Sequence, residues 1–158
     1  GLGSLVMGHQ HATGEELHTT VGRRLRAAQM RYSRSRHAVV EVLAAAARPL
    51  TLPEVLSAGQ QQDLAQSSAY RNLNELAEAG VVRRVTAGDD HTRFELHESL
   101  TGHHHHLECT ACGRLDDFEV SDEFEAGIEA LVVSAAQRGF VVNAHRFDLL
   151  GRCVACAQ

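Results

Sequence analysis

Hydrophobic residues recur with a helical period through much of the first half of the chain. In the segment 33–47, SRSRHAVVEVLAAAA, an apolar stripe is formed by Val39, Val42, Leu43 and Ala46. A serine at position 33 or 35 is a suitable N-cap, and Arg48-Pro49 ends the pattern. The pattern predicts a helix here, preceded by another helical stretch from about Glu15 to Met30.

Two more helices follow, each with its own start or stop signal. Thr51 is a good N-cap for a short helix that has Pro53 in its first turn. In AQSSAYRNLNELAEAGVV, Leu73, Leu76 and Ala77 fall on one face. Ser67 or Ser68 is expected to cap this helix, and Gly80 is expected to close it.

The pattern then changes to the alternation that is typical of strands. Val81–Val85 and Thr92–His97 flank the turn residues AGDD and predict a hairpin. Helices followed by a two-stranded hairpin are the element order of a winged helix-turn-helix.

The remaining residues predict a small α/β unit. Strands are expected at His104–Cys109, Leu115–Val120 and Phe140–Leu150, with a helix at Asp122–Arg138. The fold class is therefore α/β (α+β), an N-terminal winged helix-turn-helix followed by a small α/β unit. The predicted divisions are a flexible tail 1–20 (1–6 being a cloning remnant), a DNA-binding domain 21–97, a hinge 98–102 and a metal-binding domain 103–158.

Charge separates the same two halves. All 15 basic residues are arginines, and residues 20–97 carry eleven of them against eight acids. Residues 98–158 carry four arginines against ten acids. The first half is therefore at about +3 and the second at −6, which indicates different partners. With no long apolar run and no signal segment in the sequence, a cytoplasmic protein is expected.

The predicted second helix of the helix-turn-helix carries side chains suited to DNA. Hydroxyl, phenol, guanidinium and amide groups near its start fit phosphates and guanine edges. The candidate DNA-binding residues are Ser68, Tyr70, Arg71, Asn74 and, from the preceding helix, Arg36. The alternative interpretation is a helical module whose arginines are merely solvated, because +3 is weak evidence for DNA binding.

The four cysteines form two CxxC pairs, Cys109/Cys112 and Cys153/Cys156. Each pair presents two thiolates to one ion, so two pairs complete a closed Cys₄ zinc site. Redox CxxC motifs and plain buried cysteines are the alternatives. We predict a structural zinc ion without an open position for catalysis.

Four consecutive histidines, 103–106, precede the first CxxC pair. Successive side chains of a strand point to opposite faces, so His103 and His105 share one face and His104 and His106 the other. The run is therefore interpreted as two metal half-sites, back to back.

Other residues are candidates to complete these half-sites. Glu95 and His97 share a strand face and can close one of them, and His91 is left undecided. His145 and Glu125 are candidates for the other, with a hydrogen-bonded core histidine and a solvated carboxylate as the respective alternatives. The remaining histidines are expected not to be ligands: His9, His11, His18 and His37.

The segments SSAYRNLNELAEAGVV, RFELH, HHHHLECTACG, AH and GRCVAC, in this order, resemble the ferric uptake regulator (Fur) family of bacterial metalloregulators. The resemblance covers the chain from about Arg31 to Cys156. It implies a homodimeric transcription factor, usually a repressor, that binds an inverted-repeat operator in double-stranded DNA when loaded with metal. It also implies that the C-terminal α/β unit is the dimerisation domain.

The resemblance also implies residue roles. Tyr70 and Arg71 match the recognition-helix pair, and the four cysteines match the structural zinc site. His104 and His106, with Glu95 or His97, match the regulatory site. The second site is matched by His103, His105, Glu125 and His145.

The histidine run and GRCVAC are most similar to the zinc uptake regulators, although these usually have a cysteine where His97 stands and an aspartate where Arg83 stands. The iron and peroxide types carry a histidine near Pro49 that is absent here. We predict a regulatory Zn²⁺, with Fe²⁺, nickel, manganese or peroxide sensing as alternatives. A metal-dependent hydrolase or a metal-storage protein are the alternatives of another class; the helix-turn-helix argues against an enzyme.

Overall fold

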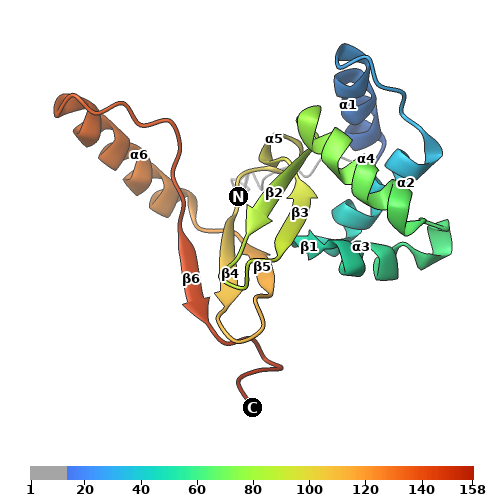
Figure 1. Ribbon diagram of the computed structural model, residues 1–158. Coiled ribbons are helices and arrows are strands. Elements are labelled where there is room, and N and C mark those ends of the chain that lie inside the picture. The colour runs from blue at the N-terminus through green and yellow to red at the C-terminus, as the bar shows by residue number, and fades with distance from the viewer. Residues whose placement is uncertain (1–13) are drawn as a thin grey trace, which may run out of the picture. The chain divides into compact units, whose positions relative to one another are not determined.

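The computed structural model describes residues 14–158, in two compact units (Figure 1). The first unit ends at His103 and the second runs from His104 to Gln158. Residues 1–13 of the predicted tail lie outside the described residues. The rest of that tail prediction is wrong, because helix α1 (Gly14–Ala27) already begins at Gly14 and buries Leu17 against the core.

The capping signals of the first unit act largely as the sequence indicates. The hydroxyl of Ser33 accepts a hydrogen bond from the N–H of Arg36 and caps α2 (Arg34–Ala46). Thr51 and Glu54 form a reciprocal capping box at the start of α3 (Leu52–Ala58).

The recognition-helix candidate, α4 (Gln66–Glu78), follows a short 3₁₀ turn (Gln60–Gln62). Its N-cap is Ala65 and not a serine, so the expected cap at Ser67 or Ser68 is wrong; both serines lie inside the first turn. Gly80 has a φ of +75° and ends the helix, as predicted, in the left-handed conformation that glycine adopts without steric cost.

A three-stranded antiparallel sheet completes the first unit, with the strand order β1-β3-β2. Strands β2 (Val82–Thr86) and β3 (Thr92–Leu96) form the predicted hairpin, and the unpredicted β1 (Leu50–Thr51) pairs with β3. One aliphatic core joins the sheet to the helices, and its fully buried members include Val21, Leu25, Val39, Val40, Val55, Leu73, Leu76 and Val81. Each such side chain stabilises the unit by roughly 1.5–3 kcal/mol through burial.

The predicted hinge 98–102 contains a short helix, α5 (Glu98–Thr101). The ring nitrogen Nδ1 of His97 accepts a hydrogen bond from the N–H of Ser99 and thereby caps this helix. The division between the units falls one residue beyond the expected hinge, after His103.

The second unit is built on a mixed sheet with the strand order β5-β4-β6. Strand β4 (His105–Cys109) pairs antiparallel with β5 (Leu115–Phe118) and parallel with β6 (Asp148–Gly151). Helix α6 (Asp122–Gln137), capped by Ser121, lies in the crossover that a parallel connection requires.

The third predicted strand, Phe140–Leu150, is much shorter than expected. Residues 140–147 are not strand, and β6 begins at Asp148 opposite His106. In this register, residues ahead of Phe147 would have to pair beyond the start of β4, where no strand is available to accept their hydrogen bonds.

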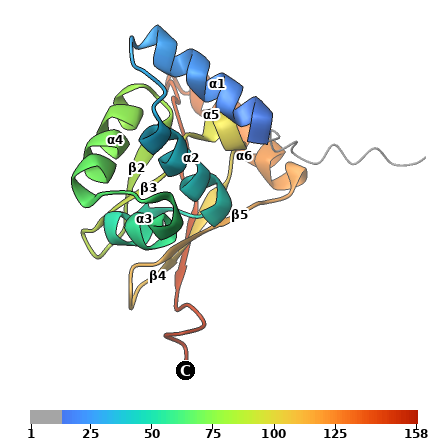
Figure 2. The ribbon, with the colours of Figure 1, turned by 90° about the vertical axis from the view of Figure 1, so that its right-hand side faces the viewer.

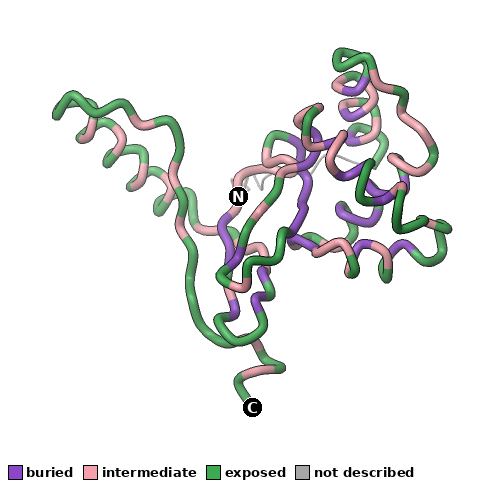
Figure 3. Tube along the Cα trace, viewed as in Figure 1, coloured by how far each residue is buried: buried purple, intermediate pink, exposed green. Residues whose placement is uncertain are grey.

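Helix α6 and strand β6 bury none of their residues, in contrast to the helices of the first unit (Figure 3). Large apolar side chains are exposed on these two elements and on the segments that follow them, at Leu131, Val133, Phe140, Val141, Leu149, Leu150 and Val154. We call this set the exposed apolar face of the second unit. Within the described residues 14–158, no helix is long and apolar enough to cross a membrane.

Candidate metal centres and nucleic-acid interface

The two CxxC pairs meet because of the parallel pairing of β4 with β6. Parallel strands end at the same edge of a sheet. One CxxC pair begins at Cys109, the last residue of β4, and the other begins at Cys153, just after the end of β6. Thr110 donates its N–H to the carbonyl of Gly151 at 2.8 Å, which joins the two chain segments just before the turns. Gly113, with a φ of +79°, turns the first segment back into β5.

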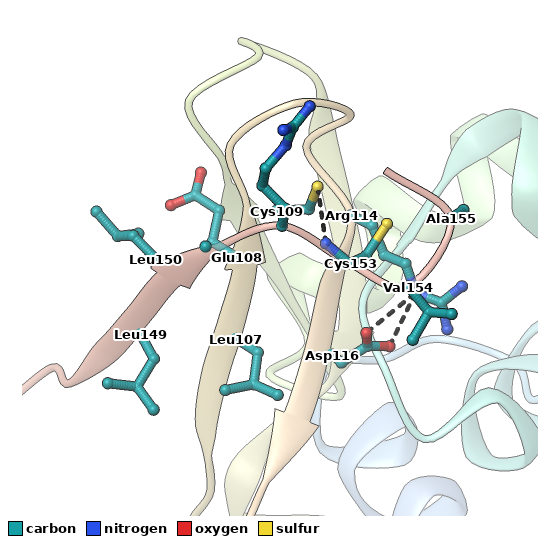
Figure 4. A pocket seen from close by; sticks show the side chains of 12 residues that line it. Leu107, Glu108, Cys109, Arg114, Asp116, Leu149, Leu150, Cys153, Val154 and Ala155 are labelled. Atoms are coloured by element: carbon teal, nitrogen blue, oxygen red, sulfur yellow. Dashed lines mark hydrogen bonds and ion pairs between the residues drawn. The ribbon is translucent and has the colours of Figure 1, made fainter. Parts of the chain in front are cut away.

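The four sulfur atoms lie within 4.8 Å of one another. The Sγ atoms of Cys112 and Cys153 are 3.8 Å apart, which is about the edge of a tetrahedron with zinc–sulfur bonds of 2.3 Å. The N–H of Cys153 donates to the Sγ of Cys109 at 3.3 Å (Figure 4). The four cysteines are free thiols, and the arrangement fits a closed structural zinc site.

Hydrogen bonding separates the acidities of these thiols. Donation from the N–H of Cys153, and then from that of Cys112, lowers the pKa of Cys109 to about 6. Hydrogen bonds with the thiols of Cys153, Cys112 and Cys109 raise the pKa of Cys156 to about 12. One member of the cluster is therefore a thiolate, the form that binds metal, close to neutral pH.

His105 of the histidine run faces the helix side of the second unit. The Nε2 atom of His105 is 2.5 Å from Oε1 of Glu125, and the other oxygen of Glu125 is 3.5 Å from Nε2 of His145. The ring of His105 is 2% exposed and contacts Phe118, Phe124 and Phe147. Two imidazoles and a carboxylate therefore converge from β4, α6 and the segment before β6.

The even-numbered histidines face the other way. Nε2 of His104 is 3.3 Å from Oδ2 of Asp117, and Nε2 of His106 is 3.3 Å from Oδ1 of the same carboxylate. The side chains of all three are between 10% and 19% exposed. Within the second unit, this places two imidazoles and one carboxylate around a common point, as a divalent metal site requires.

Asp117 was not predicted as a ligand from the sequence. It lies on β5 directly opposite His106, and this register cannot be read from the spacing of residues along the chain. The available signal was strand parity within LDDF: Leu115 and Asp117 share a face, and a carboxylate on a strand beside two histidines is a candidate ligand.

The residues expected from the first unit make their own contacts there. Glu95, 4% exposed, pairs with the guanidinium of Arg83 at 2.6 Å. His97 caps α5, and Nδ1 of His103 is 2.8 Å from Oε2 of Glu98. His91 is exposed and lies just before β3. The roles of Glu95, His97 and His103 as metal ligands stay predictions.

The candidate DNA-binding residues of α4 are accessible. Tyr70 is 54% exposed, and the side chain of Arg71 is 79% exposed while its Nε donates to Glu75 at 3.1 Å. Asn74 accepts a hydrogen bond from Arg84 of β2 at 2.7 Å, and Ser68 is half-buried in the first turn.

Arg36 differs from the other four. Its guanidinium pairs with Glu75 and donates to the carbonyl of Arg31 at 2.6 Å, and its side chain is 14% exposed. These contacts join α2 to α4 and give Arg36 a structural part in the helix-turn-helix.

The arrangement, a winged helix joined to a unit with cysteine and histidine clusters, has counterparts among known proteins. The model of the ferric uptake regulator family matches residues 27–150. This chain belongs to that family. The peroxide operon regulator of Bacillus subtilis is 30% identical to it over 133 residues, 82% of this chain and 86% of the relative. The ferric uptake regulation protein of Cupriavidus metallidurans is 35% identical over 95 residues, 60% of this chain and 62% of the relative.

The solved structure of the Helicobacter pylori ferric uptake regulator has the same fold. The match between the two structures covers 94% of this chain and 96% of the Helicobacter pylori chain, with a TM-score of 0.72 and 22% sequence identity. Proteins of the ferric uptake regulator family are metal-responsive transcription regulators and not enzymes. The expectation of a regulator is therefore confirmed, and the hydrolase alternative falls away.

Proposed function

We propose that this protein is a repressor of metal-uptake genes that binds an inverted-repeat operator as a homodimer when a regulatory Zn²⁺ ion is bound. The observation that carries the proposal is the group formed by His104, His106 and Asp117. Two imidazoles and a carboxylate leave room for a further ligand, and we propose Glu95 or His97 of the first unit for it.

A ligand from each unit makes the metal a restraint between them. The linker 98–102 joins the winged helix to the second unit, so fixing the two units to each other sets where a dimer presents its two α4 helices. Operators with half-sites at a given spacing then select the metal-bound dimer. When no metal ion is bound, the guanidinium of Arg83 is an alternative partner for the carboxylate of Glu95, as the ion pair between them shows.

The exposed apolar face of the second unit supports dimerisation. Apolar patches of this kind on α6 and β6 indicate an interface, and a second copy offers a matching surface through two-fold symmetry.

The remaining sites have supporting parts in this proposal. We propose that the Cys₄ cluster holds the structural zinc and that His103, His105, Glu125 and His145 form a second metal site. On α4, Ser68, Tyr70, Arg71 and Asn74 are proposed to contact DNA. The site of action is the cytoplasm, where operator DNA is found.

The direct test is fluorescence anisotropy of a labelled inverted-repeat duplex, titrated with protein at fixed free zinc. We expect tight binding with zinc and weak binding without it. Asp117→Asn should abolish the zinc response, whereas the neighbouring Asp116→Asn, which removes only a pair with Arg114, should keep it. Equal affinity for operator and scrambled duplex, with and without metal, would contradict the proposal.

The donor set of this site also favours a metal other than zinc as the regulatory ion. Histidine and carboxylate without a thiolate suit Fe²⁺ and Mn²⁺ as well as zinc, and the Bacillus subtilis relative is named a peroxide regulator. If Fe²⁺ is the regulatory metal, anaerobic iron should restore operator binding to the metal-free dimer, and hydrogen peroxide should then release the DNA. Zinc-loaded protein serves as the control, because Zn²⁺ has no redox chemistry.

A further inference from the structure

A fourth group of metal-binding side chains lies in the first unit, where α1 packs on α2 (Figure 2). His18 comes from α1, and His37 and Glu41 come from α2. One ligand atom from each of these three residues lies within 4.8 Å of the others. Both histidines were expected not to be ligands. Their spacing in the sequence does not show that α1 packs on α2.

Local geometry aligns the three side chains. His37 and Glu41 are four residues apart on α2, so they project from one face of the helix. The rings of His18 and His37 stack with centroids 3.7 Å apart and planes 10° from parallel, and Nε2 of His18 contacts the carboxylate of Glu41. His37 and Glu41 are exposed, so an ion has a path from solvent.

A neighbouring phenol orients His18. Nδ1 of His18 is 2.5 Å from the hydroxyl of Tyr32. Burial, with a smaller contribution from Glu41, raises the pKa of Tyr32 far above its ordinary value, so this group remains a neutral phenol. A hydrogen-bonded Nδ1 fixes the ring orientation and leaves Nε2 as the ligand, as outer partners of metal-bound histidines commonly do.

We infer that His18, His37 and Glu41 form a further binding site for a divalent transition metal, with Tyr32 as its positioning residue. Two imidazoles and one carboxylate are the ligand set of open zinc sites, with water in the remaining position, and imidazole selects Zn²⁺ or Ni²⁺ over Mg²⁺ and Ca²⁺. The ion would join α1 to α2 within the DNA-binding unit. The inference does not depend on the proposed function, because it concerns metal binding within one unit.

The test is equilibrium dialysis of the full-length protein against a zinc buffer, followed by elemental analysis of zinc per chain. Glu41→Gln and His37→Asn should each bind one equivalent less than the wild type. Glu15→Gln is the matched control, because it removes the same charge from an exposed position of α1 outside the cluster, and it should bind as the wild type does. Equal zinc content in all four proteins would overturn the inference. The cluster would then be a contact between histidine and carboxylate side chains that binds no metal.

A second readout reports on the site itself. The chain has two tyrosines, Tyr32 and Tyr70, and no tryptophan, so Tyr70→Phe makes Tyr32 the sole intrinsic fluorophore. In this background, zinc should change the emission of Tyr32 saturably, and adding Glu41→Gln should abolish the change. An unchanged emission across the zinc titration would count against the inference.

Discussion

Single carboxylates decide much of the local structure of this protein. Glu54 closes the capping box of α3, Glu75 holds Arg36 and Arg71, and Asp117 gathers two histidines. Asp89 is the example with the clearest pH signature: both of its oxygens accept hydrogen bonds from Arg93 at 2.8 Å across the tip of the hairpin.

This contact predicts a pH-dependent stability. The hydrogen bonds of Arg93 lower the pKa of Asp89 from 3.8 to about 2. A lowered folded-state pKa stabilises the fold above about pH 4, and the contribution is lost as the pH falls through about 2. Asp89→Asn should therefore lower the free energy of unfolding at neutral pH, and the difference from wild type should vanish towards pH 2 in denaturant titrations.

The matched control is the next residue. Asp90 adopts a φ of +64°, which asparagine tolerates well, so Asp90→Asn should leave the unfolding free energy nearly unchanged. A loss of stability in Asp89→Asn that is constant between pH 7 and pH 2 would refute the ion-pair explanation.

Features that are set by local sequence signals could be predicted from the sequence. Features that depend on the register between strands could not. Ser33, Thr51 and Gly80 mark helix ends through their own chemistry, and all three act as predicted. Asp117 and the shortened β6 depend instead on which residue of β4 each faces, which is fixed only when the sheet forms. The contact of His18 with His37 likewise needs two helices to pack.

At the scale of the recognition helix, α4 carries a further prediction. Arg71→Ala should weaken operator binding by about 1–3 kcal/mol if the guanidinium reads a base edge, and Tyr70→Phe should cost less because only a hydroxyl is lost. Anisotropy titrations against operator and random duplex measure both. Arg114→Ala, which removes an exposed arginine of the second unit, is the charge-matched control. An equal loss in Arg71→Ala and Arg114→Ala would indicate a general charge effect.

The two CxxC turns are the corresponding element of the second unit. Structural zinc contributes folding free energy directly, on the order of 10 kcal/mol, so Cys109→Ser should unfold this unit or prevent dimerisation. Thr110→Ser, in the same turn, keeps a hydroxyl for the carbonyl of Gly151 and should remain folded. Circular dichroism and light scattering compare the two; a folded Cys109→Ser dimer with unchanged zinc content would disprove the assignment.

At the scale of the whole molecule, we propose that the histidine run contributes ligands to two metal sites with different effects, one on stability and one on DNA binding. Strand parity separates the imidazole of His105, directed at Glu125, from those of His104 and His106, directed at Asp117. The first group lies among the aromatic side chains of the second unit, and we propose that a metal ion bound there adds stability. The second group is the one we propose to restrain the winged helix, so its metal controls DNA binding.

The most direct measurement is operator affinity, with and without zinc, for alanine variants of the four histidines in turn. His104→Ala and His106→Ala should abolish the zinc response and leave the dimer intact. His103→Ala and His105→Ala should reduce stability or zinc sensitivity by degrees and retain part of the response. A uniform, mild effect at all four positions would contradict the account and indicate an undifferentiated histidine tract.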